Sequence, residues 1–247
     1  MKRSTGNYNG IPYLRYDPIG TPQGTILFLH GQGEKGNDIK DGTTSIIERN
    51  EIPKLCITAG FEVPYIVIAP QLASNQGGWY ANTTGPIIQM CVNLGLPVHL
   101  TGLSLGSMVG PTLIADNPGV FSSLATCCGK MEVSDPTKLL TLYKELLRIP
   151  SVHYYDPTDQ TIAYGYLSIK SMCDIMKSRG ADCTLFNLSG GHSIWSQAYN
   201  LTHYWAWLQT KISPISETTG PGIWDGTTLN FTTSSGKILK IKPDATA

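Results

Sequence analysis

The sequence has no long apolar run and no excess of charge of one sign. No stretch of its 247 residues is long and apolar enough to cross a bilayer, so we expect no membrane span. Lys plus Arg and Asp plus Glu number 18 each and are interspersed, so we expect no nucleic-acid partner. Residues 1–10 are polar and lack the apolar centre of a signal peptide. A soluble cytoplasmic protein and a secreted one whose signal peptide is absent from this chain both stay open, as does the oligomeric state.

Metal and disulfide patterns are also scarce. The six cysteines contain no CxxC pair and no metal-ligand spacing, and HExxH is absent, so we predict no metal and no cofactor. Cys127 and Cys128 follow an apolar run and fit small buried side chains. Cys173 and Cys183 are compatible with a disulfide in an oxidised compartment, although cysteine usage as a whole favours reduced thiols.

The chain does contain a regular alternation of short apolar runs and longer helix-like stretches. The predicted strands cover residues 25–30, 65–69, 98–101, 123–127, 151–155 and 183–187. The predicted helices cover residues 44–59, 85–94, 105–116, 138–148, 162–178 and 195–211. This order predicts an α/β fold with a mostly parallel, doubly wound sheet and helices on both faces.

The composition changes after Ser213. Residues 214–226 are rich in Pro, Gly, Ser and Thr, which is typical of a linker. Residues 228–232 and 237–241 then alternate apolar and polar side chains, which predicts a short β-hairpin. We therefore predict one α/β domain over residues 1–213 and a linker with a small C-terminal extension over residues 214–247, of unassigned role.

Gly102-Leu103-Ser104-Leu105-Gly106 fits the motif G-x-S-x-G. The motif directly follows a predicted strand and directly precedes a predicted helix, which is the context in which a serine projects above a sheet from a strained turn. The two glycines leave room for the backbone to form that turn. This context favours Ser104 as a nucleophile over a glycine-rich turn with an incidental serine.

A serine nucleophile needs a base within hydrogen-bond reach. His192 follows Ser189-Gly190-Gly191 in a loop after the last predicted strand, where glycines allow the chain to turn the imidazole back over the sheet. We predict His192 as the general base rather than a surface histidine. The other histidines lie in a glycine motif, in strands or in a helix: His30, His99, His153 and His203.

The base in turn needs a carboxylate that orients its ring. Asp159, in the loop after the strand at 151–155, is the predicted acid. Asp156 is a close rival but lies at the strand end, where it is expected to cap the turn at Pro157. Asp135 precedes Pro136 and fits a helix N-cap.

An acyl transfer also needs donors for the oxyanion of its tetrahedral intermediate. The amide of Leu105 begins a predicted helix and so adds the positive end of the helix dipole. A second amide is expected from His30-Gly31-Gln32-Gly33, after the first predicted strand, and we assign it to Gln32. Close packing alone is the alternative explanation for these glycines.

The segments L-H-G-Q-G-E-K-G, G-L-S-L-G and G-G-H, with the late Asp159, resemble the α/β-hydrolase carboxylesterases over residues 10–212. The resemblance is strongest to the small lidless group, which includes phospholipase/carboxylesterase-like enzymes, dienelactone-hydrolase-like proteins and feruloyl or acetyl-xylan esterases related to polyhydroxybutyrate depolymerases. It implies that residues 1–213 form the catalytic domain of a serine esterase. It also implies that aromatic residues, here Trp79 and Trp195, line the acyl or sugar side of the site. Around the acid, the family's His-Gly is replaced by Tyr155-Asp156.

Only about twenty residues separate the strands at 123–127 and 151–155, which leaves no room for a helical cap domain. We therefore expect an open groove that accepts an ester of a bulky alcohol, with an acyl or feruloyl ester of a polysaccharide as the preferred substrate. A peptidase or lipase with the same three residues is an alternative, although no lid is visible. A non-catalytic binding module on the same fold is a second alternative.

Overall fold

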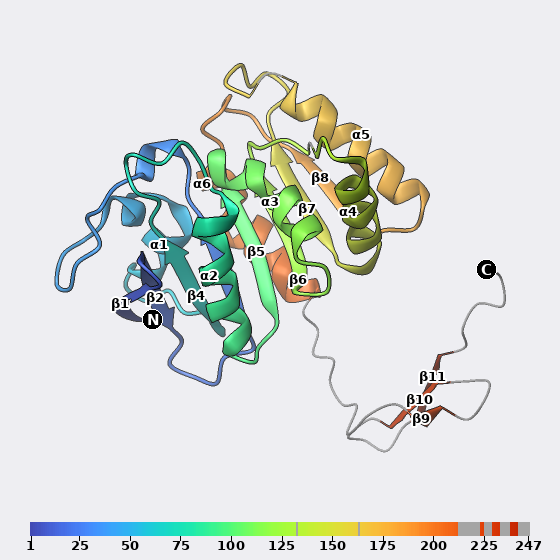
Figure 1. Cartoon of the computed structure of the whole chain (residues 1–247), viewed down its shortest axis with the longest axis horizontal. Helices are drawn as coiled ribbons and strands as arrows, with labels where there is room; N and C mark the ends of the chain where they lie inside the picture. Colours follow the sequence, from blue (N-terminus) through green and yellow to red (C-terminus); the bar gives the residue numbers. More distant parts are fainter. Residues whose placement is uncertain (132, 163, 212–222, 225–228, 233–237, 242–247) are drawn as a thin grey trace. The chain divides into compact units, whose positions relative to one another are not determined.

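The computed structural model describes residues 1–131, 133–162, 164–211, 223–224, 229–232 and 238–241 (Figure 1). Contacts divide the chain into two units, residues 1–200 and 201–247. The domain boundary predicted after residue 213 lies outside the described residues and stays a prediction.

The first unit is built on an eight-stranded sheet. Its strands are β1 (Lys2–Tyr8), β2 (Ile11–Asp17), β3 (Gly24–Leu29), β4 (Tyr65–Pro70), β5 (Val98–Leu103), β6 (Phe121–Cys127), β7 (Ser151–Tyr155) and β8 (Cys183–Asn187). Their order is β1-β2-β4-β3-β5-β6-β7-β8, and every neighbouring pair from β4 to β8 is parallel. Each parallel strand matches a predicted strand to within two residues at either end. The predicted fold class is confirmed.

The two antiparallel strands precede the first predicted strand. β1 and β2 form a hairpin, and β2 adds to β4 at the edge of the sheet. Asn9 and Gly10 make the turn with φ of 50° and 84°. Asn-Gly is the residue pair that tight hairpin turns favour, because both positions need positive φ. That dipeptide was the available sequence signal for the hairpin.

The helices of the first unit are α1 (Glu51–Cys56), α2 (Ala81–Asn93), α3 (Leu105–Asp116), α4 (Pro136–Arg148), α5 (Gly165–Ser178) and α6 (Trp195–Ala198), with 3₁₀ turns η1 (Gln32–Glu34) and η2 (Ile46–Arg49). The predicted helix over residues 44–59 is wrong as a continuous element: η2 and α1 are separated by Asn50, which is extended. Pro53 has no amide to donate to the carbonyl of Arg49, so an unbroken helix would lose a hydrogen bond there.

Helices cover both faces of the sheet. Figure 1 shows α2, α3, α4 and α5 over one face, where Leu27 and Leu29 of β3 enter the hydrophobic core. Phe28 points to the other face and meets Tyr199, just after α6, with ring centroids 6.0 Å apart. All six residues of β3 are buried, as expected for a parallel strand covered on both sides. The carboxyl ends of such strands are where a site can form.

The connection from β6 to β7 contains α4 and no other helix among its described residues. It therefore has the short form expected of a chain without a cap domain. No helix in the described part of the chain has the length and apolar character needed to span a membrane.

The second unit contains a π-helical turn, η3 (Leu201–Trp205), followed by α7 (Ala206–Lys211). Its strands are β9 (Ile223–Trp224), β10 (Leu229–Thr232) and β11 (Ile238–Ile241). β10 and β11 pair antiparallel, which confirms the predicted hairpin, and β9 adds a third strand to it. The predicted helix over residues 195–211 is wrong as one element, because α6 ends at Ala198 and η3 interrupts the α-helical pattern.

Candidate active site

Ser104 stands at the turn between β5 and α3. Its backbone angles, φ 48° and ψ −116°, lie in a region that residues with a side chain rarely occupy. Such a conformation costs about 1–3 kcal/mol and persists where the surroundings enforce it. The Ser104 amide donates to the carbonyl of Cys127 at 2.8 Å, and the Ser104 carbonyl accepts from the amide of Met108 at 2.9 Å. These bonds hold the strained turn from both sides.

The glycines two positions either side of Ser104 are needed because the backbones are in close contact. A Cβ on Gly106 would overlap the carbonyl of Leu29 at the end of β3. A Cβ on Gly102 would lie 2.7 Å from the carbonyl carbon of Gly106 and 2.8 Å from the carbonyl oxygen of Leu29. The start of α3 therefore sits directly against β3, and only glycine fits at either position.

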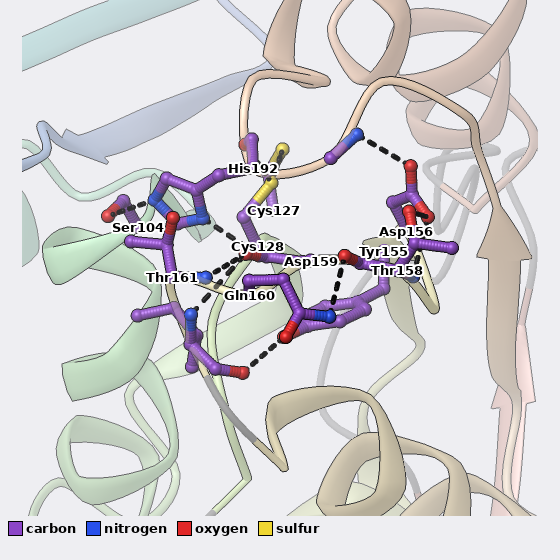
Figure 2. Close-up of polar contacts among 12 residues, drawn as sticks. Ser104, Cys127, Cys128, Tyr155, Asp156, Thr158, Asp159, Gln160, Thr161 and His192 are labelled. Carbon is purple, nitrogen blue, oxygen red and sulfur yellow. Dashed lines mark hydrogen bonds and ion pairs between the residues drawn. The ribbon is translucent and has the colours of Figure 1, made fainter.

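His192 comes from the loop after β8 and faces Ser104 across 88 positions of sequence. Its Nε2 lies 2.8 Å from Ser104 Oγ, and its Nδ1 lies 2.7 Å from Asp159 Oδ2 (Figure 2). Because a carboxylate only accepts hydrogen bonds, Nδ1 carries the proton of the neutral ring. Nε2 is then the atom that can accept the hydroxyl proton of Ser104.

Asp159 is the carboxylate that reaches the imidazole. Its side chain is fully buried, and its Oδ1 accepts from the amide of Thr161 at 2.7 Å. Asp156 instead binds the backbone of the histidine loop, through the amides of Gly190 and Gly191. The three side chains predicted as nucleophile, base and acid thus meet in one line of hydrogen bonds, and their chemical roles stay predictions.

Asp135 lies at the N-terminus of α4. It accepts from the amides of Thr137 and Lys138 at 2.8 and 3.0 Å, as the N-cap expected from the sequence. Both bonds lower the pKa of Asp135, since they stabilise its ionised form.

The loop after β3 lies against the serine turn. A Cβ on Gly31 would be 3.4 Å from Cβ of Ser104 and 2.7 Å from Leu103 Cδ1. Gln32 begins η1 and Leu105 begins α3, so both amides are at the ends of helical turns where no preceding carbonyl is available. Their assignment to an oxyanion site stays a prediction.

The ring of His30 forms hydrogen bonds that hold the loop after β3 in place. Its Nε2 accepts from the amide of Leu72 at 3.0 Å, and its Nδ1 lies 2.6 Å from the carbonyl of Gly31 and carries the proton. Burial lowers the pKa of His30 to about 4, so the ring is neutral at pH 7. A neutral, fully buried histidine fits a structural role.

The two predicted aromatic residues differ in their surroundings. Trp79 is buried; its Nε1 donates to the carbonyl of His30 at 3.1 Å, and it borders a cavity of about 160 Å³. Tyr80, its neighbour, has 55% of its surface exposed. Trp195 is half-buried and stands edge-on to His192, with ring centroids 5.9 Å apart. A substrate-binding role for Trp79 or Trp195 stays a prediction.

Solved structures share this architecture. A thermostable esterase has a TM-score of 0.58 at 19% identity, over 85% of this chain and 59% of its own, so this chain spans less than two thirds of it. The esterase domain of a Rhodothermus marinus protein has a TM-score of 0.57 at 16% identity, over 85% of this chain and 98% of the domain. The acylaminoacyl peptidase of Pyrococcus horikoshii has a TM-score of 0.58 at 10% identity, over 89% and 43% of the two chains. No protein-family model matches the sequence, and no curated protein does.

The chain has the α/β-hydrolase fold. At these identities the likeness concerns the fold alone. Because two esterases and a peptidase share it, the α/β-hydrolase fold does not by itself select a reaction.

A pocket of about 480 Å³ opens beside Asp159. Three tyrosines contribute to its wall, and Tyr164 among them is 79% exposed. The other lining residues are Tyr155, Pro157, Gln160, Ile162, Tyr166 and Leu167. A wall of aromatic side chains with a few polar groups is common in pockets that bind small molecules.

Two groups of ligand-type side chains lie close together in the described part of the chain: His153, Cys173 and Cys183, and Cys128, Asp159 and His192. The second group contains the predicted acid and base, whose facing atoms are already hydrogen-bonded to each other. In the first group, Sγ of Cys173 lies 2.9 Å from Sγ of Cys183, and both are free thiols. The two cysteines that the sequence left open as a disulfide are thus separate thiols in this structure, and the absence of a metal stays a prediction.

Cys128 is buried, as the sequence predicts, but its place beside the site was not predicted. It follows β6 with φ 53°, and its Sγ donates to the carbonyl of His192 at 2.9 Å. A cysteine after an apolar strand gives no local signal of such a contact, because its partner lies 64 positions away.

Proposed function

We propose that this chain is a serine carboxylic-ester hydrolase that forms an acyl-enzyme on Ser104. The observation that carries the proposal is the continuous line of hydrogen bonds from Ser104 Oγ through His192 to Asp159, at 2.8 and 2.7 Å. A serine hydroxyl is a weak nucleophile, and an adjacent base with an oriented ring is what activates it. The strained backbone of Ser104 supports the same reading, since strain of this kind clusters at active sites.

The proposed reaction has two halves. Ser104 Oγ attacks the ester carbonyl carbon while His192 Nε2 takes the hydroxyl proton, and Asp159 stabilises the imidazolium that results. The tetrahedral intermediate collapses, His192 returns the proton to the departing alcohol oxygen, and an acyl group remains on Ser104. Water then attacks the acyl carbon while His192 Nε2 takes one of its protons. The bond between the acyl carbon and Ser104 Oγ breaks, His192 returns the proton to Oγ, and the carboxylic acid leaves. The amides of Leu105 and Gln32 would hold the oxyanion in both halves.

For the substrate we propose an acyl or feruloyl ester of a polysaccharide. The described residues of the β6–β7 connection contain no helix besides α4, and so short a connection suits an alcohol that extends away from the reacting bond. The tyrosine-walled pocket beside Asp159 supports a ring-containing group on that side. A peptidase or lipase with the same machinery is the alternative within this fold.

Turnover of short p-nitrophenyl esters, with fluorophosphonate labelling mapped by mass spectrometry, tests the proposal. We expect ester turnover and a single adduct on Ser104. Acetylated xylan, feruloylated xylan, a long-chain triglyceride and an acylated peptide assayed in parallel then rank the substrate classes. Release from peptide alone would favour the peptidase, and neither turnover nor label would favour a non-catalytic binding module.

Variants of the proposed base and the proposed acid test these two assignments. His192→Ala and Asp159→Asn are each expected to lower kcat by several orders of magnitude, because the three groups act as a unit. Ser193→Ala, an exposed serine next to His192, is the matched control and should keep full activity. Full activity in Asp159→Asn would contradict the assignment of the acid.

A further inference from the structure

The loop that carries His192 is short, glycine-rich and exposed in part, so it needs anchors. Gly190 and Gly191 have φ of 147° and 66°, which side-chain-bearing residues rarely adopt. A loop of this composition has high conformational entropy when it is not held. Placing an imidazole within hydrogen-bond distance of two partners therefore requires contacts that act on the backbone itself.

Asp156 supplies such contacts from the adjacent loop after β7. Its Oδ2 accepts from the amides of Gly190 and Gly191 at 2.7 and 2.6 Å. Its Oδ1 accepts from the amide and the hydroxyl of Thr158 at 2.7 and 2.8 Å. Figure 2 shows Asp156 facing the histidine loop, away from the imidazole that Asp159 contacts. Each carboxylate oxygen of Asp156 therefore accepts two hydrogen bonds.

The charge of Asp156 suits this position. Hydrogen bonds from the Thr158 amide, then from Gly191, from the Thr158 hydroxyl and from Gly190 lower the pKa of its carboxyl far below the usual range. Charge-assisted bonds to amides are shorter and stronger than neutral ones. Two successive amides that converge on one oxygen fix the direction of the backbone just before His192.

One turn of the chain contacts both the imidazole ring of His192 and the backbone of the loop that carries it. Asp159 donates its amide to the carbonyl of Asp156 at 3.0 Å, so the two aspartates belong to one turn. Asp159 orients the ring of His192, and Asp156 orients the backbone that carries it. A shift of this turn would move both contacts together.

We infer that Asp156 is a positioning residue for the reaction, which sets the place of His192 by binding the two amides that precede it. This inference rests on the proposed function for its kinetic consequence. Asp156 touches neither Ser104 nor the imidazole, and it acts through the loop backbone. Glycines have no side chains with which to bind the rest of the protein, so the carboxylate of Asp156 holds this loop through its backbone amides instead.

Asp156→Asn is the variant that tests the inference. The volume is kept, but an amide group has one acceptor oxygen, so its NH₂ must face either the two glycine amides or Thr158. We expect kcat per fluorophosphonate-titrated site to fall about 10- to 100-fold, with KM unchanged within about twofold, as for a small misplacement of a catalytic group. We also expect the low-field proton resonance of the His192 Nδ1–H bond to broaden, and amide exchange at residues 190–191 to accelerate.

Asp135→Asn is the matched control. Asp135 also accepts from two backbone amides, but it does so at the start of α4. Its loss is expected to leave kcat per titrated site and the low-field resonance unchanged. A purely structural role of Asp156 would lower the amount of active protein without changing either quantity.

Wild-type kcat per site and an unchanged resonance in Asp156→Asn would overturn the inference. If that variant does not fold, Thr158→Val decides, because it removes one bond to Oδ1 and keeps the carboxylate. We expect kcat to fall about two- to tenfold there, as for one lost hydrogen bond, and an unchanged kcat would overturn the inference. If the wild type turns over no ester, the proposed function fails, whereas exchange at 190–191 and the resonance still report on positioning.

Discussion

At the scale of single residues, Ser104 combines an unfavourable backbone conformation with the proposed chemical role. Its φ of 48° and ψ of −116° are accessible to glycine at little cost, whereas alanine would keep the strain. We therefore predict that Ser104→Gly unfolds with a free energy about 1 kcal/mol higher than Ser104→Ala, although glycine loses more chain entropy on folding.

Urea denaturation of the two variants measures this difference directly. Both variants lack the hydroxyl and should lack ester turnover, so activity does not confuse the comparison. Equal stabilities, or a more stable alanine variant, would show that the turn carries no strain that glycine relieves.

At the scale of elements, the contact between α3 and β3 depends on Gly106. A Cβ there would overlap the Leu29 carbonyl, and neither backbone can move without shifting the serine turn. Gly106→Ala is therefore expected to destabilise the protein by several kcal/mol and to abolish labelling of Ser104, in the range of severe core overpacking.

Gly85 in α2 is the matched control for that substitution. Apart from its chain neighbours and the backbone of its own helix, a Cβ added to Gly85 meets no atom within 4 Å. Gly85→Ala should change the free energy of unfolding by no more than about 1 kcal/mol, because the better helix propensity of alanine is opposed by the contact of its Cβ with the ring of Pro86. Thermal unfolding of both variants checks the pair, and a tolerated Gly106→Ala would contradict the close packing described above.

At the scale of the whole molecule, we predict from two buried histidines that the free energy of unfolding decreases in acid. Burial lowers the pKa of His30 and of His99 to about 4, against about 6.5 in an unfolded chain. Between these values the unfolded state binds protons that the folded state excludes, so the free energy of unfolding falls as pH falls from about 6.5 to about 4. Each histidine contributes up to about 3 kcal/mol of this loss.

Urea unfolding at pH 7 and at pH 4.5 measures this effect. His99→Gln should flatten the pH dependence by removing one of the two groups, whatever its effect on stability at pH 7. An equal free energy of unfolding at the two pH values in the wild type would contradict the prediction.

Much of the fold was predictable because its signals are local. Among the six parallel strands, β3, β4, β5 and β7 are buried along their whole length. The helix α3 begins and ends at the predicted residues. The edge hairpin of β1 and β2 was missed, since its strands are only partly buried and lack such runs. The continuous helix predicted over residues 44–59 failed because Pro53 removes a backbone donor that apolar periodicity does not report.

The sequence by itself determined the strand-turn-helix that displays Ser104, because its glycines, apolar strand and helix are contiguous and act through local backbone geometry. Only the tertiary structure decided which aspartate faces the imidazole. Asp156 and Asp159 share one turn, and their side chains are distinguished by which part of a loop more than thirty positions away each one contacts. It also decided that His192 reaches Ser104, because a hydrogen bond across 88 positions depends on how parallel strands align their carboxyl ends. Helix and strand propensities act between residues close in sequence, whereas the meeting of Ser104, His192 and Asp159 is set by tertiary packing between distant segments.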